Sequence, residues 1–405
     1  MKKNMQSISQ SILLVLGSLI FALLLSECVL RVLGVQSAVK RFTGQYSVHE
    51  MSPNLKLLYK LRPNASNPAH GVLNKINSGG FRDKEYPVQK DPSKYRILFL
   101  GDSVVYGYGL SLADTLPKQL EEVFKKSSRP TEVLNFGVSG YEAEQAIEFL
   151  KESGLKYHPD MVIVGYTLND SRYGSMELDK LSELPGNNIC EMGTNPLKNG
   201  MTFLYDHSKL LAFLDERLHI QRKVKELKSN RSPIRRYIAD RNKSIKDSAN
   251  SDYRQLEASV VADAKKLGVP DHELNNALEM TGLRTTGEIG LSHWNVSKNA
   301  FLELQKLSQK HHFKVVVVIF PYLEDLARYP LKSMHVFLKN QFQSMGFTTL
   351  DLLEHCQSLT VEERSNLSFD NIHFTPWGSS NAANYIYDEI SLIDLKNDSK
   401  GVQNG

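Results

Sequence analysis

Short apolar runs and segments of helical periodicity alternate along much of this 405-residue chain. Short apolar runs, several of them ending in Gly, Asn or Asp, predict strands buried on both faces of a parallel sheet. The runs are YRILFLGDS, TEVLNFGVSGY, PDMVIVGYTLND, FKVVVVIFP and FTTLDLL. Segments between and after them place apolar residues at helical spacing, such as Leu116, Leu120 and Phe124. Such alternation requires right-handed crossovers, so we predict an α/β fold, a flavodoxin-like parallel sheet with helices on both faces.

The first apolar segment has a different pattern, because nearly every position from Ile12 to Leu25 is apolar. Roughly 20 apolar residues span a bilayer, and the segment from Ile12 to Leu33 reaches that length. Lys2 and Lys3 precede it, so the positive-inside rule places the N-terminus in the cytoplasm and the rest of the chain outside. This pattern predicts an N-terminal transmembrane helix with an extracytoplasmic domain, periplasmic or at the cell surface.

These features predict four regions. They are a cytoplasmic tail (1–10), a transmembrane anchor (11–33), a linker or surface strap (34–75) and a folded domain (76–405). A cleaved signal peptide is the alternative to an anchor. It is disfavoured because no small-x-small cleavage site clearly follows the apolar run, and Glu27 stands where a lipoprotein site needs a small residue.

A long segment from about 172 to 291 interrupts the alternation of strands and helices. Within it, Leu210, Leu214 and Leu218 recur at helical spacing, and two further short helices are predicted near 251–268 and 270–280. We interpret the segment as a helical insertion that caps the carboxyl edge of the sheet. Four of its basic residues are predicted to meet an anionic surface or ligand: Arg222, Lys223, Arg235 and Arg236.

Composition narrows the class of protein. With 41% hydrophobic and 23% charged residues the chain is globular, and a net charge of +4 is too small to favour nucleic acid as a partner. Cys28, Cys190 and Cys356 lack metal-ligand spacing, and one disulfide at most, Cys190 to Cys356, can form outside the apolar segment. No metal and no cofactor are predicted.

Polar residues follow three of the predicted strands. Ser103 stands in GDS, Gly140 in GVSG and Asn169 in LND. Each is also a common turn residue. Ligands of open parallel sheets bind outside the carboxyl ends of the strands, so these three residues are expected to converge on one crevice.

A fourth segment near the C-terminus supplies the groups that a serine nucleophile needs. In SFDNIHFTPWG, Asp370 and His373 lie three residues apart in a predicted loop before a helix. One rigid segment can therefore provide a base for the Ser103 proton and a carboxylate to orient that base.

Together the four segments resemble the SGNH, or GDSL-type, hydrolases, whose name gives Ser, Gly, Asn and His in chain order. FLGDSVVYGYG resembles the nucleophile segment, NFGVSG the glycine segment, LND the asparagine segment and DNIHFTPWG the Asp-x-x-His segment. NSGGFRDKEYP also resembles the lead-in of membrane-anchored bacterial members. The resemblance covers about 77–390 without the insertion.

The resemblance implies a catalytic role for several residues. Ser103 would be the nucleophile, His373 the general base and Asp370 the residue that orients His373. Ser103 N–H, Gly140 N–H and the Asn169 side chain would form the oxyanion hole. Gly137 is the alternative glycine. The chain departs from the family pattern at Val105, where Thr or Ser is frequent, and at 166–168, where glycines are common.

The implied function is a serine esterase that cleaves acyl esters, of a lipid or an acylated glycan, through an acyl-enzyme on Ser103. The alternatives are an O-acyltransferase or deacetylase acting on an envelope polysaccharide, and a non-catalytic glycan- or lipid-binding protein. The intact set of Ser103, Asp370 and His373 disfavours the non-catalytic alternative.

Overall fold

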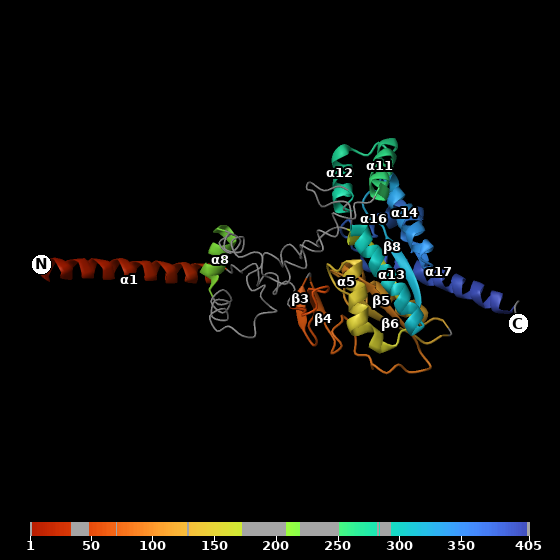
Figure 1. The fold of residues 1–405 in the computed structure, drawn as a ribbon, viewed down its shortest axis with the longest axis horizontal. Coiled ribbons are helices and arrows are strands. Elements are labelled where there is room, and N and C mark those ends of the chain that lie inside the picture. Colours follow the sequence, from red (N-terminus) through yellow and green to blue (C-terminus); the bar gives the residue numbers. More distant parts are fainter. Residues whose placement is uncertain are drawn as a thin grey trace. The chain divides into compact units, whose positions relative to one another are not determined.

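The computed structural model of the chain describes residues 2–33, 48–69, 71–127, 129–171, 208–218, 251–281, 283 and 293–402 (Figure 1). They fall into two compact units. One unit contains α1 (Lys2–Val32) and α8 (Lys209–Leu218), and the other contains the remaining described elements. The predicted residues Cys190, Arg222, Lys223, Arg235 and Arg236 lie outside the described ranges.

A five-stranded parallel sheet forms the centre of the second unit, in the order β6-β5-β7-β8-β9. Its strands are β5 (Tyr95–Gly101), β6 (Thr131–Gly137), β7 (Met161–Thr167), β8 (Lys314–Phe320) and β9 (Thr348–Asp351). Numbered along the sheet strands alone, this order is 2-1-3-4-5, the flavodoxin-like arrangement. The predicted fold class is confirmed.

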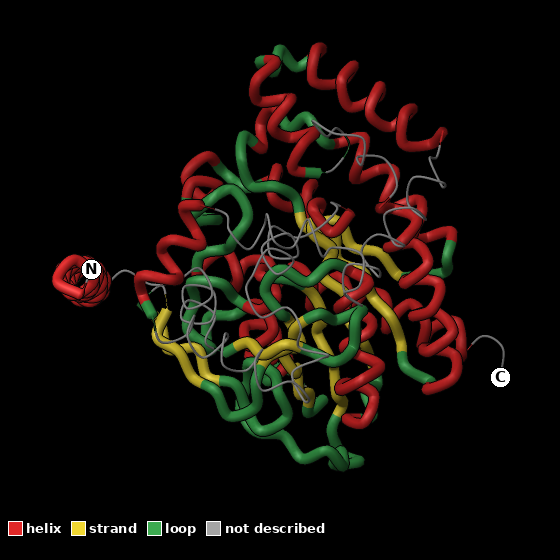
Figure 2. The backbone as a smooth tube through the Cα atoms, turned by 60° about the vertical axis from the view of Figure 1, so that its left-hand side comes forward, coloured by secondary structure: helices red, strands yellow, loops and turns green. Residues whose placement is uncertain are grey.

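The strands are apolar because both faces of the sheet are covered. All seven residues of β5 and of β7 are buried. Removing an Ile or Val side chain from water stabilises the fold by about 1.5–3 kcal/mol, which favours β-branched runs in these central strands. Figure 2 shows the strands between helices.

Right-handed crossovers assign the helices to the two faces of the sheet. The chain moves from β5 to β6 in one direction and from β6 to β7 in the other, so the intervening helices α4 and α5 lie on opposite faces. In agreement, α4 packs on α17 and α5 packs on α13. The bounds are α4 (Leu116–Phe124), α5 (Ala143–Phe149), α13 (His293–His311), α14 (Lys332–Ser344), α15 (Leu352–Ser358), α16 (Val361–Ser365) and α17 (Pro376–Val402).

Residues 48–75, which the sequence predicts to be part of a linker or surface strap, form two small antiparallel pairs. The strands are β1 (His49–Met51) with β2 (Tyr59–Leu61), and β3 (Ser66–Ala69) with β4 (Val72–Lys75). Leu57 and Tyr59 are fully buried, and the Tyr59 hydroxyl donates to the Ser139 carbonyl at 2.8 Å. This part of the chain therefore belongs to the folded unit and is not a free linker.

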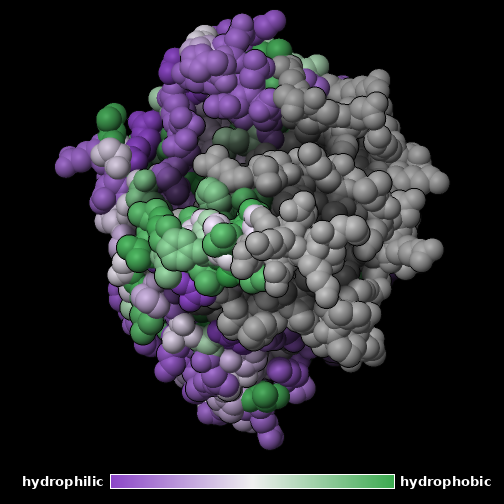
Figure 3. Space-filling view, turned by 90° about the vertical axis from the view of Figure 1, so that its left-hand side faces the viewer, coloured by the Kyte–Doolittle hydropathy of each residue, from purple (hydrophilic) through white to green (hydrophobic). Residues whose placement is uncertain are grey.

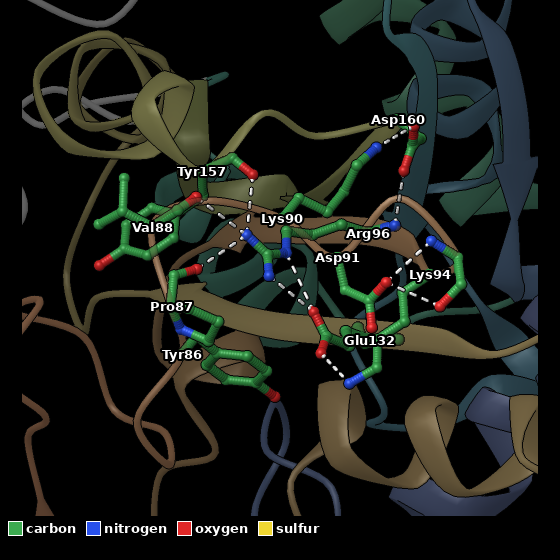
Figure 4. A network of polar contacts seen from close by, with 12 residues as sticks. Tyr86, Pro87, Val88, Lys90, Asp91, Lys94, Arg96, Glu132, Tyr157 and Asp160 are labelled. Carbon is green, nitrogen blue, oxygen red and sulfur yellow. Dashed lines mark hydrogen bonds and ion pairs between the residues drawn. The ribbon is translucent and has the colours of Figure 1, made fainter.

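A buried charge network holds the amino ends of β5 and β6 together, as Figure 4 shows. Arg96 is fully buried, and its guanidinium pairs with Glu132 of β6 at 2.8 Å. It also donates to the Tyr157 carbonyl at 3.0 Å, while the Asp160 carboxylate accepts the Arg96 N–H at 2.7 Å. A buried charge is tolerated when it is paired and hydrogen-bonded in this way.

The described parts of the insertion belong to different units. α11 (Ser251–Lys266) and α12 (Asp271–Met280) are two short helices, as predicted, and α11 packs on α14 in the unit of the sheet. α8, which carries the predicted leucine stripe, packs instead on α1. Glu27 of α1 accepts hydrogen bonds from the backbone N–H groups of Lys209 and Leu210 at the start of α8. A cap formed by the whole insertion stays a prediction.

α1 contains a stretch, Leu13–Val32, whose mean hydropathy of 2.5 and length suit a membrane span. Its large apolar side chains are exposed to solvent, among them Leu14, Phe21 and Leu24. Figure 3 shows hydrophobic residues gathered in a patch on the face that it draws. A membrane anchor and a signal sequence both have this length and composition.

Candidate active site

The strand order brings three predicted site residues to one edge of the sheet. β5 lies between β6 and β7, and Ser103, Gly140 and Asn169 each follow the carboxyl end of one of these strands. Ser103 begins the one-turn helix α3 (Ser103–Tyr106), and Asn169 lies in the 3₁₀ turn after β7. The expected convergence on the carboxyl edge follows from this topology.

The turn that carries Ser103 is held at its start by Asp102. This carboxylate accepts the Val104 N–H at 2.9 Å, which satisfies a donor of the first turn of α3. Within the described residues, the Ser103 N–H has no hydrogen-bond acceptor. Burial raises the pKa of Asp102, and burial together with the charge of Asp102 raises the pKa of Asp170 well above its usual range.

Arg82 holds the other end of the same turn. Its side chain is fully buried and donates to the carbonyls of Tyr106 at 2.8 Å, Gly107 at 2.7 Å and Leu110 at 2.5 Å. These carbonyls follow the end of a one-turn helix, where backbone acceptors lack intrahelical partners. Arg82 therefore fixes the main chain just after Ser103.

Asp83, the next residue, connects the same segment to β6. Its carboxylate accepts the Asn135 N–H at 2.9 Å and pairs with Lys118 at 2.8 Å. In the sequence this Gly-Phe-Arg-Asp segment stands out only by its resemblance to a family lead-in. Two adjacent charged residues, Arg82 and Asp83, follow the apolar Phe81, and this pattern could have indicated a buried structural role.

Asp370 and His373 lie in a tight turn within residues 366–375, here called the His373 loop. Ser368 and Phe374 form a bridge across its base. The Asp370 Oδ1 atom accepts the backbone N–H of Ile372 at 2.8 Å and of His373 at 2.6 Å. The carboxylate thus shapes the loop and faces the imidazole at the same time.

The His373 imidazole joins the other two predicted catalytic side chains. His373 Nε2 lies 2.8 Å from Ser103 Oγ, and His373 Nδ1 lies 2.7 Å from Asp370 Oδ2. With Nδ1 donating to the carboxylate, neutral His373 presents Nε2 as an acceptor for the serine proton. The two distances are of hydrogen-bond length, so Ser103, His373 and Asp370 form a continuous series of side-chain contacts.

The electrostatics keep the Asp370 carboxyl ionised. Burial favours its neutral form, but hydrogen bonds from the His373 backbone, the His373 ring and the Ile372 backbone outweigh burial and lower the pKa of Asp370. A carboxylate beside Nδ1 would stabilise an imidazolium at this position.

Two aromatic rings flank the imidazole. The Tyr108 ring centroid lies 4.6 Å from that of His373, and the Phe369 ring stacks on His373 at 5.9 Å with an interplanar angle of 14°. Phe369 is 49% exposed. Burial, and then the charge of Asp370, raise the pKa of Tyr108, so its hydroxyl is neutral at physiological pH. The sequence motifs assign no role to either ring.

The predicted oxyanion donors Gly140 and Asn169 and the alternative Gly137 differ in their burial and in the hydrogen bonds that they already make. Gly140 is half-buried with φ +78°. Gly137, the alternative, is buried, and its N–H donates to Asn135 Oδ1 at 3.0 Å. A Cβ on Gly137 would lie 2.2 Å from the Tyr106 nitrogen, so this glycine serves close packing. Asn169 Oδ1 is buried and makes no hydrogen bond within the described residues.

Within the described part of the chain, no group of three or more His, Cys, Asp or Glu residues is arranged to hold a metal ion. A groove of about 380 Å³ lies at the opposite end of the sheet from Ser103. It is lined by the first residues of three strands, Met161, Lys314 and Thr348, and it is not part of the site described above.

The fold and the site define a class: an α/β protein with a flavodoxin-like sheet and a Ser–His–Asp relay at its carboxyl edge. The order of its motifs is that of the SGNH hydrolases, which the sequence resembles. No protein-family model matches the chain, and no curated protein matches it by sequence.

Among solved structures, the chain is similar to several esterases and acylhydrolases. A lipase/acylhydrolase from Enterococcus faecalis is 12% identical, with a TM-score of 0.35, and the match covers 73% of this chain and 95% of that one. An acetyl xylan esterase is 10% identical (TM-score 0.35, 73% and 99% covered). An acetylxylan esterase from Geobacillus stearothermophilus is 12% identical (TM-score 0.35, 75% and 96% covered).

Proposed function

We propose that the protein is a serine esterase of the SGNH type that hydrolyses carboxylic esters through an acyl-enzyme on Ser103. The observation that carries the proposal is the continuous relay from Ser103 Oγ to His373 Nε2 at 2.8 Å and from His373 Nδ1 to Asp370 Oδ2 at 2.7 Å. Ser103 meets His373, 270 residues further along the chain, and its neighbour Asp370 at these distances, at the edge where such sheets bind ligands.

In the first half of the reaction, Ser103 Oγ attacks the ester carbonyl carbon while His373 Nε2 takes the hydroxyl proton. The carbonyl oxygen becomes an oxyanion, and the Ser103 N–H, the Gly140 N–H and the Asn169 amide donate to it. Each such donor stabilises the transition state by on the order of 3 kcal/mol. The C–O bond to the alcohol then breaks, and His373 returns its proton to the departing alcohol.

In the second half, water attacks the acyl-enzyme and His373 takes one of its protons. Collapse of the second tetrahedral intermediate releases the carboxylic acid and restores the Ser103 hydroxyl with the proton from His373. An alcohol in place of water would give acyl transfer, so the relay suits an O-acyltransferase as well as a hydrolase.

Turnover of p-nitrophenyl acetate, followed in parallel with fluorophosphonate labelling, tests the proposal. Hydrolysis together with labelling of the wild type supports an esterase. Labelling with product release only when a sugar alcohol is added would favour acyl transfer. Absence of both labelling and turnover would contradict a catalytic function and favour the non-catalytic binding protein.

Replacing Asn169 by Ala is expected to lower kcat by roughly 10² to 10³ with a smaller effect on KM. The reason is that an oxyanion donor acts mainly in the transition state. Steady-state kinetics on p-nitrophenyl acetate measure both constants. Asn384→Ala, which removes an exposed amide on α17 that donates to the Ser380 carbonyl outside the site, should leave kcat unchanged. A change confined to KM would make Asn169 a substrate-binding residue instead.

We also propose that α1 anchors the protein in a membrane, with the domain on the extracytoplasmic side and residues 1–10 in the cytoplasm. The apolar stretch Leu13–Val32 supports an anchor, and Lys2 and Lys3 support the orientation. An anchor would keep the proposed esterase close to acyl esters at the membrane or in the cell envelope.

The anchor has a direct test in the intact chain. Residues 1–33 should stay attached, and the protein should remain in the membrane fraction after alkaline extraction, because about 20 apolar residues hold a helix in the bilayer. N-terminal sequencing and a C-terminal reporter that is active only outside the cytoplasm measure cleavage and topology. A mature chain that begins near Ser37 in the soluble fraction would show a cleaved signal peptide.

A further inference from the structure

A second loop, residues 321–331, follows β8 and forms hydrogen bonds with the His373 loop. The Leu323 N–H donates to the Asn371 carbonyl at 2.7 Å. The Asn371 side-chain amide donates to Glu324 Oε2 at 2.8 Å. Asn371 lies between Asp370 and His373, so both hydrogen bonds act on the short segment that joins the base to its carboxylate.

The 321–331 loop is in turn fixed by a buried tyrosine. The Tyr329 hydroxyl accepts the Tyr322 N–H at 3.1 Å and lies 3.0 Å from His335 Nε2. His335 is 1% exposed and Tyr329 is 3% exposed. Tyr322 immediately precedes Leu323, so the hydroxyl acts next to the N–H that holds Asn371.

Asp351, the last residue of β9, sets the direction of these hydrogen bonds. Its carboxylate lies 2.8 Å from His335 Nδ1 and accepts the Leu353 N–H at 3.0 Å. With Nδ1 donating to Asp351, neutral His335 offers Nε2 as an acceptor. The Tyr329 hydroxyl then donates to His335 and keeps a lone pair for the Tyr322 N–H. Each polar atom from Asp351 to the Tyr322 N–H is then either a donor or an acceptor of a hydrogen bond.

The geometry points to Tyr329 as a positioning residue for the His373 loop, an inference that rests on the proposed function. Through the Tyr322 N–H it fixes the main chain at Leu323, and Leu323 holds Asn371. Tyr329 touches none of the reacting groups, so it acts only on where His373 lies. A displacement of a catalytic group by about 1 Å can cost 10²-fold in rate, so a small shift of this loop is enough to matter.

The same loop also contacts the insertion. The Tyr322 hydroxyl donates to the Met280 carbonyl at the end of α12 at 3.3 Å, and Ser333, just beyond the loop, donates to Asp263 of α11. The 321–331 loop therefore connects α11 and α12 to the His373 loop.

Tyr329→Phe keeps the ring and removes only the hydroxyl. We expect kcat on p-nitrophenyl acetate to fall about tenfold, with KM within about twofold of the wild type, because the base moves but the binding surface does not. The low-field proton resonance of the His373–Asp370 hydrogen bond should shift or broaden. The matched control is Tyr86→Phe, which also removes a buried hydroxyl, one that pairs with Glu121 at 3.0 Å. It should leave kcat and the resonance unchanged.

A second pair of variants covers the case in which Tyr329→Phe does not fold. Glu324 is exposed, so its replacement leaves the core intact. Glu324→Ala should lower kcat a few-fold, and Glu324→Gln should restore it, because the amide oxygen still accepts from Asn371. Wild-type kcat in Glu324→Ala, or equal kcat values in Tyr329→Phe and Tyr86→Phe, would overturn the inference.

The two proposals fail in different ways. A wild-type protein with neither fluorophosphonate labelling nor ester turnover would contradict the proposed function. A labelled, active wild type whose Tyr329 and Glu324 variants behave like Tyr86→Phe would contradict the positioning role alone.

Discussion

Ser103→Ala is expected to lower kcat for ester hydrolysis by ~10⁴ or more, because it removes the atom that forms the acyl-enzyme. The fold should persist. Within the described residues the Ser103 hydroxyl hydrogen-bonds to His373, and the turn around it is held by Asp102 and Arg82. Initial rates on p-nitrophenyl acetate and thermal unfolding measure the two properties separately.

Ser111→Ala provides the matched control for this variant. Ser111 is a half-buried loop serine that donates to Asp114 at 2.6 Å, and it has no contact with His373 among its described hydrogen bonds. Its kcat should match that of the wild type. Turnover by Ser103→Ala within tenfold of the wild type would contradict the nucleophile assignment.

Asp370→Asn is expected to lower kcat by ~10⁴ with little change in KM. The carboxylate holds the Nδ1–H tautomer of His373 and stabilises the imidazolium, and an amide side chain does neither in the same way. The effect should be seen in kcat and kcat/KM alike, because the lost interaction belongs to the transition state.

Asp114→Asn is the control for a surface carboxylate outside the relay, and it should leave kcat unchanged. A loss of less than tenfold in Asp370→Asn would show that Asp370 shapes the loop through its two backbone hydrogen bonds without assisting His373 in the reaction.

The central sheet was predictable because its strands are apolar on both faces. An apolar run such as the one around Val316 is stable only when both of its faces are buried. Alternation of such runs with helices then predicts the flavodoxin-like arrangement. The pairs around Tyr59 and Asn74 were missed, because strands of three or four residues with mixed polarity give no period-2 signal. Their burial depends on contacts with distant residues, such as the bond from Tyr59 to Ser139.

The relay was predictable for a different reason. Ser103, His373 and Asp370 belong to short motifs with fixed order, and the topology of a parallel sheet brings the motifs to one edge. Arg82 and Tyr329 could not be assigned in the same way. Each acts through backbone carbonyl or N–H groups of another segment, and hydrogen bonds to the backbone leave no pattern of side-chain types in the sequence.

The helices show a similar division. α4 and α14 were predicted from their apolar spacing, whereas α15 and α16 are short and lie between β9 and the His373 loop. α5 ends at Phe149 and continues as a π-helical turn over Leu150–Gly154, a change that apolar spacing does not indicate. Gly154 packs against Leu98 of β5 there, a tertiary contact that periodicity cannot show.

Mapping the covalent adduct of a fluorophosphonate by peptide mass spectrometry tests the central claim most directly. We predict one adduct per chain, on the Ser103 hydroxyl oxygen, that forms in step with loss of esterase activity and is absent from Ser103→Ala. An adduct on another residue that abolishes activity, or full esterase activity in a chain with Ser103 modified, would contradict the account.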